Sequence, residues 1–474
     1  MQNLQRDPAS FRDPSGHVYL GDSGQIYRTV LPVAAESFSF VQSTGLLEQL
    51  VAAGQVLPYE LDPAGASTIF PQARHVLAQP RLPVISYPYE WSFHGLRAAA
   101  LLHLDIQVAA LKRGVALSDA SAYNVQFQGA SPVFIDMLSF RPYREGEFWG
   151  AHRQFCEQFL NPLLMTSTLG LDFHGWYRGR PEGITTVDLA KLIPTWRRLG
   201  WKMLTHVTLQ ARFQSTPRPD AVRLARTATL PQAAYRNVLE SLRDWIASLT
   251  PAAGPQSVWR DYSKSVHYSS DESAAKRALV SRFVGDAAPE LLLDIGCNSG
   301  DYAAIALDAG AKYVVGLEAD TGALDAAFCR AQRDRLMFLP LRADAADPSP
   351  AQGWRGLERP ALETRCKPDK LLALAVIHHL ALSRNIPLPD IVRWLVSLAP
   401  EGLVEFVPKT DGKVLEMLSL REDIFADYDE ARFRSELERH ANIRSASRIT
   451  ESGRVLYWYK VKTSSEASHQ MIGR

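Results

Sequence analysis

The stretch Leu291–Tyr302, with the sequence LLLDIGCNSGDY, decides the fold of the second half of the chain. Its first five residues are apolar except for Asp294, as in a strand that is buried on both faces of a parallel sheet. A turn that contains Gly296 and Gly300 follows, and a helical pattern comes after it. This order places the turn beyond the carboxyl end of the strand, where open α/β sheets bind their ligands.

Size and composition place the chain among ordinary globular proteins. Its 474 residues are enough for two or three domains, and 46% of them are apolar and 22% charged. A net charge of +1 lacks the basic surplus of a dedicated nucleic-acid binder, so no nucleic-acid partner is expected. No window of 18 residues is apolar throughout and the N-terminus has no apolar signal core, which predicts a cytoplasmic protein without a membrane span.

The four cysteines, Cys156, Cys297, Cys329 and Cys366, form no C-x-x-C pair. This pattern predicts neither a zinc ribbon nor a disulfide framework. It fits a reducing compartment, and the sequence alone gives no reason to expect a bound metal ion.

The chain divides at the segment TPAAGPQS, residues 250–257, which is rich in proline, glycine and alanine. Residues 1–249 mix short strands with longer helices, among them a helix across His94–Arg113, and are expected to form an α+β domain. Residues 258–465 alternate between strands and helices, and residues 466–474 are expected to form a disordered tail.

The alternation after the linker predicts a doubly wound, Rossmann-like α/β sheet. The expected strands are Leu291–Ile295, Tyr313–Glu318, Met337–Leu341, Lys370–Ile377 and Gly402–Val407. The expected helices are Gly300–Ala309, Leu324–Ala331, Pro389–Ala399 and Ala431–His440. Two further strands, Ile443–Ile449 and Arg454–Val461, predict a C-terminal β-hairpin that closes the domain.

Acidic residues stand where this sheet would bind a ligand. Asp294 opens the pattern D-x-G-x-x-x-G, which differs from the G-x-G-x-x-G loop that cradles a pyrophosphate. A carboxylate repels phosphate and suits a ligand with an amine or a sulfonium. Glu318 ends the next strand and can accept both hydroxyls of a ribose, in charge-assisted bonds of about 1.5–3 kcal/mol each. Asp344 follows the third strand and can accept from an adenine amine, with Asp347 as a competing candidate. The other interpretation is that Asp294 is a helix cap and the glycines only form turns.

Ribose without phosphate, beside an acidic glycine loop, indicates S-adenosylmethionine. On these residues, the chain from about 258 to 461 resembles class I S-adenosylmethionine-dependent methyltransferases, including those of the nodulation-protein type. The resemblance implies that Glu318 holds the ribose and that Asp344 lies near the adenine. It also implies a cofactor loop that consists of Asp294, Gly296, Cys297, Asn298 and Gly300.

The segment just before the sheet resembles the cofactor-covering lead-in of some such enzymes. In it, Tyr268, with Tyr262 and Lys276, can help to close the site. A helix with solvated charges is the alternative explanation of the same residues.

Methyl transfer from a sulfonium is an in-line displacement, in which orientation contributes about 7–11 kcal/mol. An acceptor of high pKa also needs a base. His378 and His379 follow the fourth strand, and either can serve as that base. Related methyltransferases also carry a histidine here as a structural feature. Glu405, in the fifth strand, is expected to border the acceptor pocket, and a strand end with solvated charges is the alternative.

The N-terminal half contains Asp119 and Asn124 in the spacing D-x-x-x-x-N, then a short hairpin and Asp136. The order resembles the core of protein kinases and aminoglycoside phosphotransferases, whose matching residues orient the acceptor and bind Mg²⁺. A glycine-rich loop is missing, D-M-L replaces D-F-G, and Arg28 is the nearest candidate for the lysine of V-A-I-K. We therefore expect a degenerate kinase-like domain; alternatively, the acidic residues are only turn and cap residues.

Together these features predict a two-domain S-adenosylmethionine-dependent methyltransferase whose acceptor, a small molecule or a glycan, is not identified. The kinase-like half is expected to recognise the substrate. One alternative is a bifunctional kinase–methyltransferase that uses ATP and Mg²⁺ on a glycan. Another is a non-catalytic protein that senses the cofactor.

Overall fold

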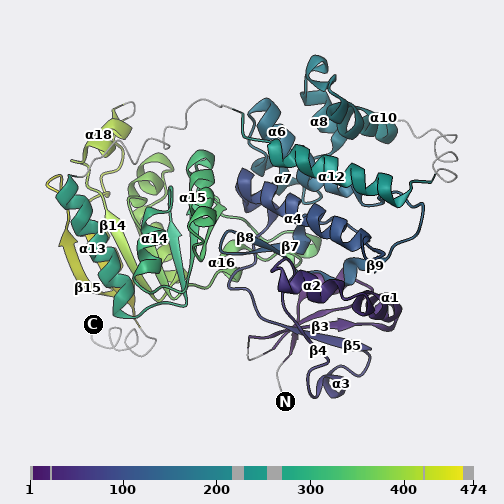
Figure 1. Ribbon diagram of the computed structural model, residues 1–474. Coiled ribbons are helices and arrows are strands. Elements are labelled where there is room, and N and C mark those ends of the chain that lie inside the picture. The colour runs from purple at the N-terminus through teal and green to yellow at the C-terminus, as the bar shows by residue number, and fades with distance from the viewer. Residues whose placement is uncertain (1–3, 22–23, 216–228, 253–268, 420–421, 463–474) are drawn as a thin grey trace. The chain divides into compact units, whose positions relative to one another are not determined.

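The chain forms two compact units (Figure 1). One consists of residues 1–255 and 351–360, and the other of residues 256–350 and 361–474. The computed structural model describes residues 4–21, 24–215, 229–252, 269–419 and 422–462. The predicted tail and most of the predicted linker lie outside these ranges. None of the helices in the described ranges combines the length and the apolar character that a membrane crossing needs.

The C-terminal unit is built on a seven-stranded mixed sheet with the order β12-β11-β10-β13-β14-β16-β15. Its strands are β10 (Leu291–Ile295), β11 (Tyr313–Glu318), β12 (Phe338–Arg342), β13 (Lys370–Ala373), β14 (Glu401–Phe406), β15 (Ala441–Arg448) and β16 (Val455–Val461). Strands β10 to β14 are parallel, and β16 runs antiparallel to both β14 and β15. The predicted α/β sheet that ends in a β-hairpin is therefore confirmed.

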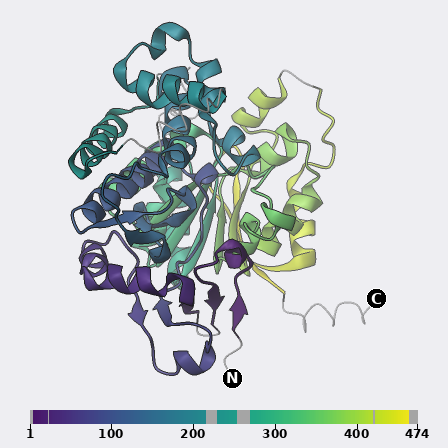
Figure 2. The ribbon, with the colours of Figure 1, turned by 90° about the vertical axis from the view of Figure 1, so that its right-hand side faces the viewer.

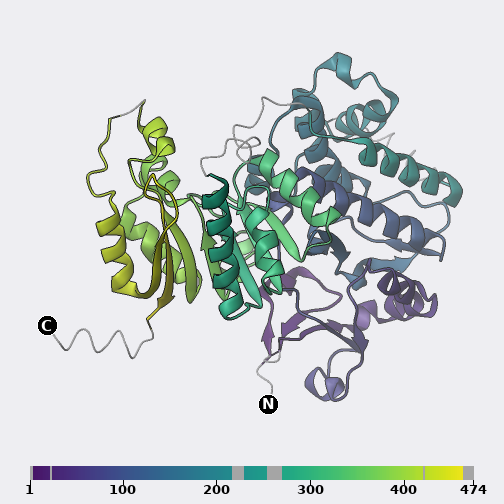
Figure 3. The ribbon, with the colours of Figure 1, turned by 60° about the vertical axis from the view of Figure 1, so that its left-hand side comes forward.

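Helices cover both faces of this sheet, as Figure 3 shows. The helices that cover it are α13 (Ser270–Asp286), α14 (Asp301–Asp308), α15 (Thr321–Arg333), α17 (Leu388–Leu398) and α19 (Glu430–His440). Helix α14 packs on β10, β11 and α13, whereas α17 packs on β14 and α19. All five residues of β10 are buried, which explains its continuous apolar sequence.

The predicted strand Lys370–Ile377 is too long. Strand β13 ends at Ala373, Ala375 has a φ of 55°, and a π-helical turn at His379–Ser383 begins shortly afterwards. Ile377 is fully buried, so its apolar character reflects packing in the core after the strand has ended.

The N-terminal unit is an α+β assembly, as predicted. Its antiparallel sheet has five strands in the order β1-β2-β3-β5-β4, at the purple end of the colour scale in Figure 2. These strands are β1 (Gln5–Arg6), β2 (Val18–Leu20), β3 (Ile26–Val30), β4 (Glu60–Leu61) and β5 (His75–Gln79). The long helix α4 (Phe93–Leu111) matches the predicted helix His94–Arg113, and α12 (Gln232–Ser248) packs along it.

Two short strand pairs follow α4 and position the acidic residues of this unit. The pairs are β6 (Val115–Leu117) with β9 (Phe140–Pro142) and β7 (Val125–Gln128) with β8 (Ser131–Phe134). Asp119 and Asn124 lie in the connection from β6 to β7, and Asp136 lies in the connection from β8 to β9.

The turn after β10 needs glycine for two separate reasons. Gly296 and Gly300 have φ values of 73° and 80°, in the left-handed region that disfavours other residues. A Cβ atom at Gly300 would lie 2.5 Å from Cε1 of Phe338, and one at Gly296 would lie 2.7 Å from Cγ2 of Val376. These glycines therefore secure the close packing of the turn on β12 and on the segment after β13.

We expect Gly300→Ala to lower the free energy of unfolding by about 2–4 kcal/mol, because it adds backbone strain and a clash with Phe338. Chemical denaturation of the full chain measures the change. Gly412→Ala is the matched control, since a Cβ there meets nothing within 4 Å and φ is not positive. Equal stability of both variants would contradict the packing described for the turn.

Candidate active site

The carboxyl ends of β10 and β11 bring two acidic side chains to the same edge of the sheet. The two strands are parallel neighbours, with Asp294 opposite Gly316, so Asp294 and Glu318 lie on adjacent strand ends. The N–H groups of Asn298 and Asp320 donate to the Glu318 carboxylate at 2.8 and 2.7 Å. The loop after β10 therefore fixes the orientation of Glu318 through its own backbone.

Asp294 is buried and incompletely satisfied. It is 2% exposed, and its Oδ2 atom has no hydrogen-bond donor among the described residues. Burial, followed by the charge of Glu318, raises the pKa of Asp294 to about 7, against the opposing charge of Lys276. A buried carboxylate oxygen without a donor is unfavourable by about 1–3 kcal/mol or more. A cationic amine placed at this oxygen would satisfy it, which fits the amine of S-adenosylmethionine.

Cys297 and Asn298, the other predicted loop residues, support the turn from inside. The N–H groups of Gly296 and Cys297 both donate to the Leu317 carbonyl, at 2.8 and 3.1 Å. The Cys297 thiol is buried and packs so closely that a Cβ on Gly316 would lie 2.6 Å from its Sγ. Asn298 has a φ of 48° and its Oδ1 accepts from the next N–H group. Both residues therefore have structural roles in shaping the loop.

Asp344 lies just after β12, and its carboxylate is already engaged. Its Oδ1 accepts from the N–H group of Ala346 at 2.9 Å, and its Oδ2 pairs with the guanidinium of Arg384. These contacts fix the carboxylate, which keeps lone pairs for a further donor. The placement beside an adenine stays a prediction.

His378 and His379 lie after β13, with ring centroids 4.2 Å apart. Burial lowers the pKa of His378 well below its usual value and that of His379 to about 4. Both imidazoles are therefore neutral at pH 7, and each is a weak base. Nδ1 of His378 has no hydrogen-bond partner within the described part of the chain.

Glu405 occupies the centre of a buried charge network. Its carboxylate accepts from Nζ of Lys276 at 2.6 Å and from Nη1 of Arg454 at 3.4 Å. Arg454 also forms a two-point pair with Asp411, at 2.7 and 2.9 Å. All four side chains are at most 5% exposed. Glu405 was expected at the border of an acceptor pocket, whereas the structure places it between two buried cations.

Sequence reasoning missed Arg454 and Asp411, because Arg454 lies 43 residues from Asp411 and 49 from Glu405 in the chain. The only local signal is a basic residue directly before the apolar run of β16. Lys276, by contrast, was a predicted site residue, and its charge also acts on Asp294. Tyr262 and Tyr268 lie outside the described residues.

The predicted acidic residues of the N-terminal unit do come together. Nδ2 of Asn124 donates to Asp119 at 3.1 Å and to Asp136 at 3.3 Å. Burial, and next the charge of Asp136, raises the pKa of Asp119 to about 7. Arg28, on β3, pairs with Asp136 at 2.7 Å and with Asp13 at 3.0 Å. One guanidinium therefore pairs with two of the carboxylates at the place that a metal ion would occupy in a kinase.

The segment 351–360, which follows β12 in the chain, belongs to this unit. The Arg359 guanidinium lies 4.1 Å from the centre of the Tyr123 ring, next to Asn124 in sequence. Nε2 of Gln352 donates to the Arg178 carbonyl at 2.7 Å. The first contact holds the segment against the loop that carries the acidic cluster, and the second holds it to α7 (His174–Gly179).

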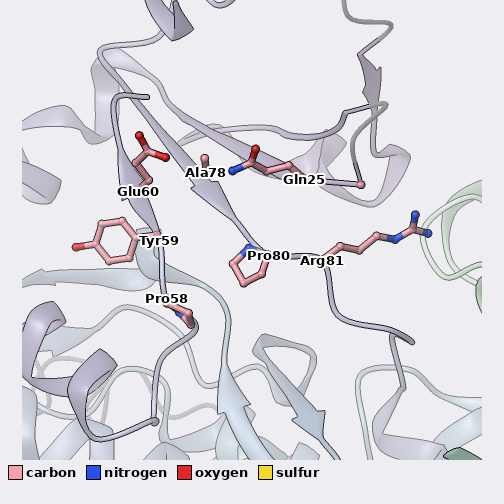
Figure 4. A pocket seen from close by; sticks show the side chains of 8 residues that line it. Gln25, Pro58, Tyr59, Glu60, Ala78, Pro80 and Arg81 are labelled. Carbon is pink, nitrogen blue, oxygen red and sulfur yellow. The ribbon is translucent and has the colours of Figure 1, made fainter. Parts of the chain in front are cut away.

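A hollow of ≈ 630 Å³ lies beside β3, β4 and β5 of the N-terminal unit (Figure 4). Its ionisable side chains are Tyr59, Glu60 and Arg81, which Figure 4 shows pointing away from one another. None of the predicted site residues lines it. The hollow therefore offers no convergent set of polar groups for a ligand.

The C-terminal half is therefore a doubly wound α/β unit in which two acidic side chains stand at the ends of adjacent strands. No protein-family model matches the sequence. The chain is 42% identical over 460 residues to the nodulation protein NoeA of Rhizobium meliloti (strain 1021), with 96% of both chains covered. It belongs to the family of that protein.

Solved structures match parts of the chain. The N-methyltransferase NodS of Bradyrhizobium japonicum covers 41% of this chain and 98% of its own, with 10% sequence identity and a TM-score of 0.32. The bifunctional kinase-methyltransferase WbdD covers 42% of this chain and 41% of its own, with 13% identity and a TM-score of 0.30.

We expect Asp294→Asn to stabilise the ligand-free protein at pH 8 by about 1–3 kcal/mol, because it removes a buried charge. The folded-state pKa of Asp294, about 7, lies above the ordinary value of an aspartic acid, 3.8. The stability that the protonated carboxyl contributes is therefore complete below about pH 4 and is lost as the pH rises through 7. The advantage of the variant should shrink accordingly towards pH 5.

Denaturation curves at pH 5 and pH 8 measure this difference. Asp308→Asn is the control, because Asp308 is an exposed carboxylate on α14 of the same unit. An Asp294→Asn variant that is no more stable than the native chain at pH 8 would refute the unsatisfied state of Oδ2.

Proposed function

We propose that the chain is an S-adenosylmethionine-dependent methyltransferase that acts on a small molecule or a glycan. The observation that carries the proposal is the buried Asp294 carboxylate, one oxygen of which has no donor in the described ranges and which stands beside Glu318. The amine of the cofactor offers Asp294 a donor of opposite charge. The ribose hydroxyls offer donors to Glu318, whose oxygens keep free lone pairs beside the two backbone N–H groups.

The bound cofactor would supply an electrophilic methyl group on a sulfonium. The role of the protein is to bind and orient the cofactor and the acceptor and to exclude water. Orientation contributes about 7–11 kcal/mol in such displacements. The turn after β10 suits this task because its backbone is already fixed by the Leu317 carbonyl and by Glu318. Little further ordering is then needed on binding.

His378 and His379 are the candidates for contact with the acceptor. A pKa of about 4 makes His379 a weak base. It is therefore better suited to accept a hydrogen bond from a hydroxyl or an amine of the acceptor than to remove a proton from that group completely. Glu405 serves as a positioning residue in this proposal, because it holds Lys276 near Asp294.

For the N-terminal unit we propose substrate recognition without phosphoryl transfer. The supporting observation is the Arg28 guanidinium, which pairs with Asp136 and supplies the positive charge that Mg²⁺ would otherwise bring. The rival is a bifunctional enzyme, in which Asp119, Asn124 and Asp136 would bind ATP with Mg²⁺.

We expect S-adenosylhomocysteine to bind the full chain with micromolar affinity in a calorimetric titration. Glu318→Ala should weaken binding about 10- to 100-fold through the loss of charge-assisted bonds. Because the cofactor amine needs an ionised Asp294, whose pKa is about 7, affinity should fall about tenfold from pH 8 to pH 6. Glu290→Ala, at an exposed ion pair with Lys312, is the control and should bind normally.

Undiminished binding by folded Glu318→Ala would place the ribose elsewhere. Binding of S-adenosylhomocysteine without labelled-methyl transfer to any cell fraction would favour the third possibility, a protein that only senses the cofactor.

We expect no heat of binding when ATP and Mg²⁺ are titrated into the same protein, because Arg28 already neutralises Asp136. Arg28→Ala tests whether Arg28 prevents this binding, because removal of the guanidinium frees the Asp136 carboxylate for a cation. Mg²⁺-dependent ATP turnover by the native chain that disappears in Asp136→Ala would establish the bifunctional enzyme instead.

A further inference from the structure

Three potential metal ligands meet in the N-terminal unit, away from the acidic cluster in sequence. His152 and Cys156 lie on the helix that begins with α5 (His152–Phe155), and His206 lies on the helical segment 201–215. The ligand atoms of these three residues all lie within 4.8 Å of one another. His152 and Cys156 are four residues apart, which puts both on one face of their helix.

The distances suit tetrahedral coordination. Nε2 of His152 lies 3.0 Å from Nδ1 of His206 and 3.6 Å from Sγ of Cys156. Around a tetrahedral Zn²⁺, with bonds of about 2.0–2.1 Å to nitrogen and 2.3 Å to sulfur, two nitrogens lie about 3.3 Å apart and nitrogen and sulfur about 3.6 Å apart. The two distances from His152 are therefore close to the tetrahedral values, and the ligand atoms of Cys156 and His206 lie within 4.8 Å of each other.

Hydrogen bonding alone explains the arrangement less well. A neutral imidazole nitrogen carries either one proton or one lone pair, so Nε2 of His152 can serve only one of its two neighbours fully. A cation at the common point satisfies all three atoms together.

The helices themselves are distorted at these residues. Cys156 begins a π-helical turn, Cys156–Leu160, and His206 lies inside another, Leu204–Thr208. Such turns are uncommon and occur often at functional sites, where they redirect a side chain. Here both distortions fall on the elements that supply the converging side chains.

We propose that His152, Cys156 and His206 bind a single Zn²⁺ ion, with a fourth position available to water or another ligand. Two imidazole nitrogens and one thiolate are ligands that zinc prefers, and hard cations such as Mg²⁺ are disfavoured by sulfur. Binding releases the Cys156 thiol proton to solvent, so the affinity falls as the pH is lowered.

The ion would also stabilise the loop that carries Asp119 and Asn124. Oε1 of Gln154 accepts from the N–H group of Ala120 at 2.9 Å, and Oε1 of Gln158 accepts from that of Ala122 at 2.8 Å. The helix that carries two of the zinc ligands thus holds the backbone of the loop between Asp119 and Asn124. A metal that joins this helix to the segment 201–215 would stabilise that loop.

The test uses the untagged full chain, stripped with a chelator and titrated with Co²⁺ as a spectroscopic substitute for Zn²⁺. We expect one equivalent to bind, with intense tetrahedral d–d bands and a thiolate-to-cobalt charge-transfer band, and Zn²⁺ to displace it. Cys156→Ser should abolish the charge-transfer band, and His206→Gln should weaken binding at least about 100-fold. Cys329→Ser, at an exposed cysteine in the other unit, is the matched control and should leave both unchanged.

If a variant does not fold, the Co²⁺ titration of the native chain alone still tests the proposed zinc site. Absence of a thiolate band in the native protein at saturating Co²⁺, or a band that survives in folded Cys156→Ser, would overturn the proposal. Zn²⁺ should also raise the unfolding temperature of the native chain, and no change on its addition would count equally against the site.

Discussion

The buried carboxylate of Glu405 is the constraint on which the C-terminal unit depends. It is fully buried on β14 and holds Lys276 from α13 and Arg454 from the position directly before β16. Removal of one partner from such a network leaves an uncompensated buried charge, which is unfavourable by about 3–5 kcal/mol. The same network orients Lys276, whose charge lowers the pKa of Asp294. The electrostatics of the candidate cofactor site are therefore set by a helix, a strand and a hairpin that the network ties together.

The two units differ in how the charges of their buried acidic residues are compensated. In the C-terminal unit, one oxygen of Asp294 has no donor among the described residues. In the N-terminal unit, Asp119 and Asp136 share the amide of Asn124, and Arg28 supplies the opposing charge from within the chain. Within the described residues, the first arrangement leaves one carboxylate oxygen without a donor, whereas in the second each carboxylate has a partner.

Sequence reasoning succeeded where the structure follows from local pattern. Asp294 and Glu318 could be placed because each ends an apolar strand, and parallel strands bring such ends to one edge. It could not find the Lys276–Glu405 or His152–His206 contacts, which join residues 129 and 54 positions apart. Nor could it separate β13 from the buried Ile377, because burial in a strand and burial after its end select the same residue types.

The segment 351–360 has a consequence for how the chain can be divided. Because it groups with residues 1–255, the polypeptide passes between the units three times, at 255/256, 350/351 and 360/361. A fragment cut at the single obvious linker would lose Arg359 from the face of Tyr123 and expose that ring. The N-terminal half is thus completed by a piece encoded inside the other half, so a cut at the linker does not yield a complete N-terminal module for recombination or for separate expression.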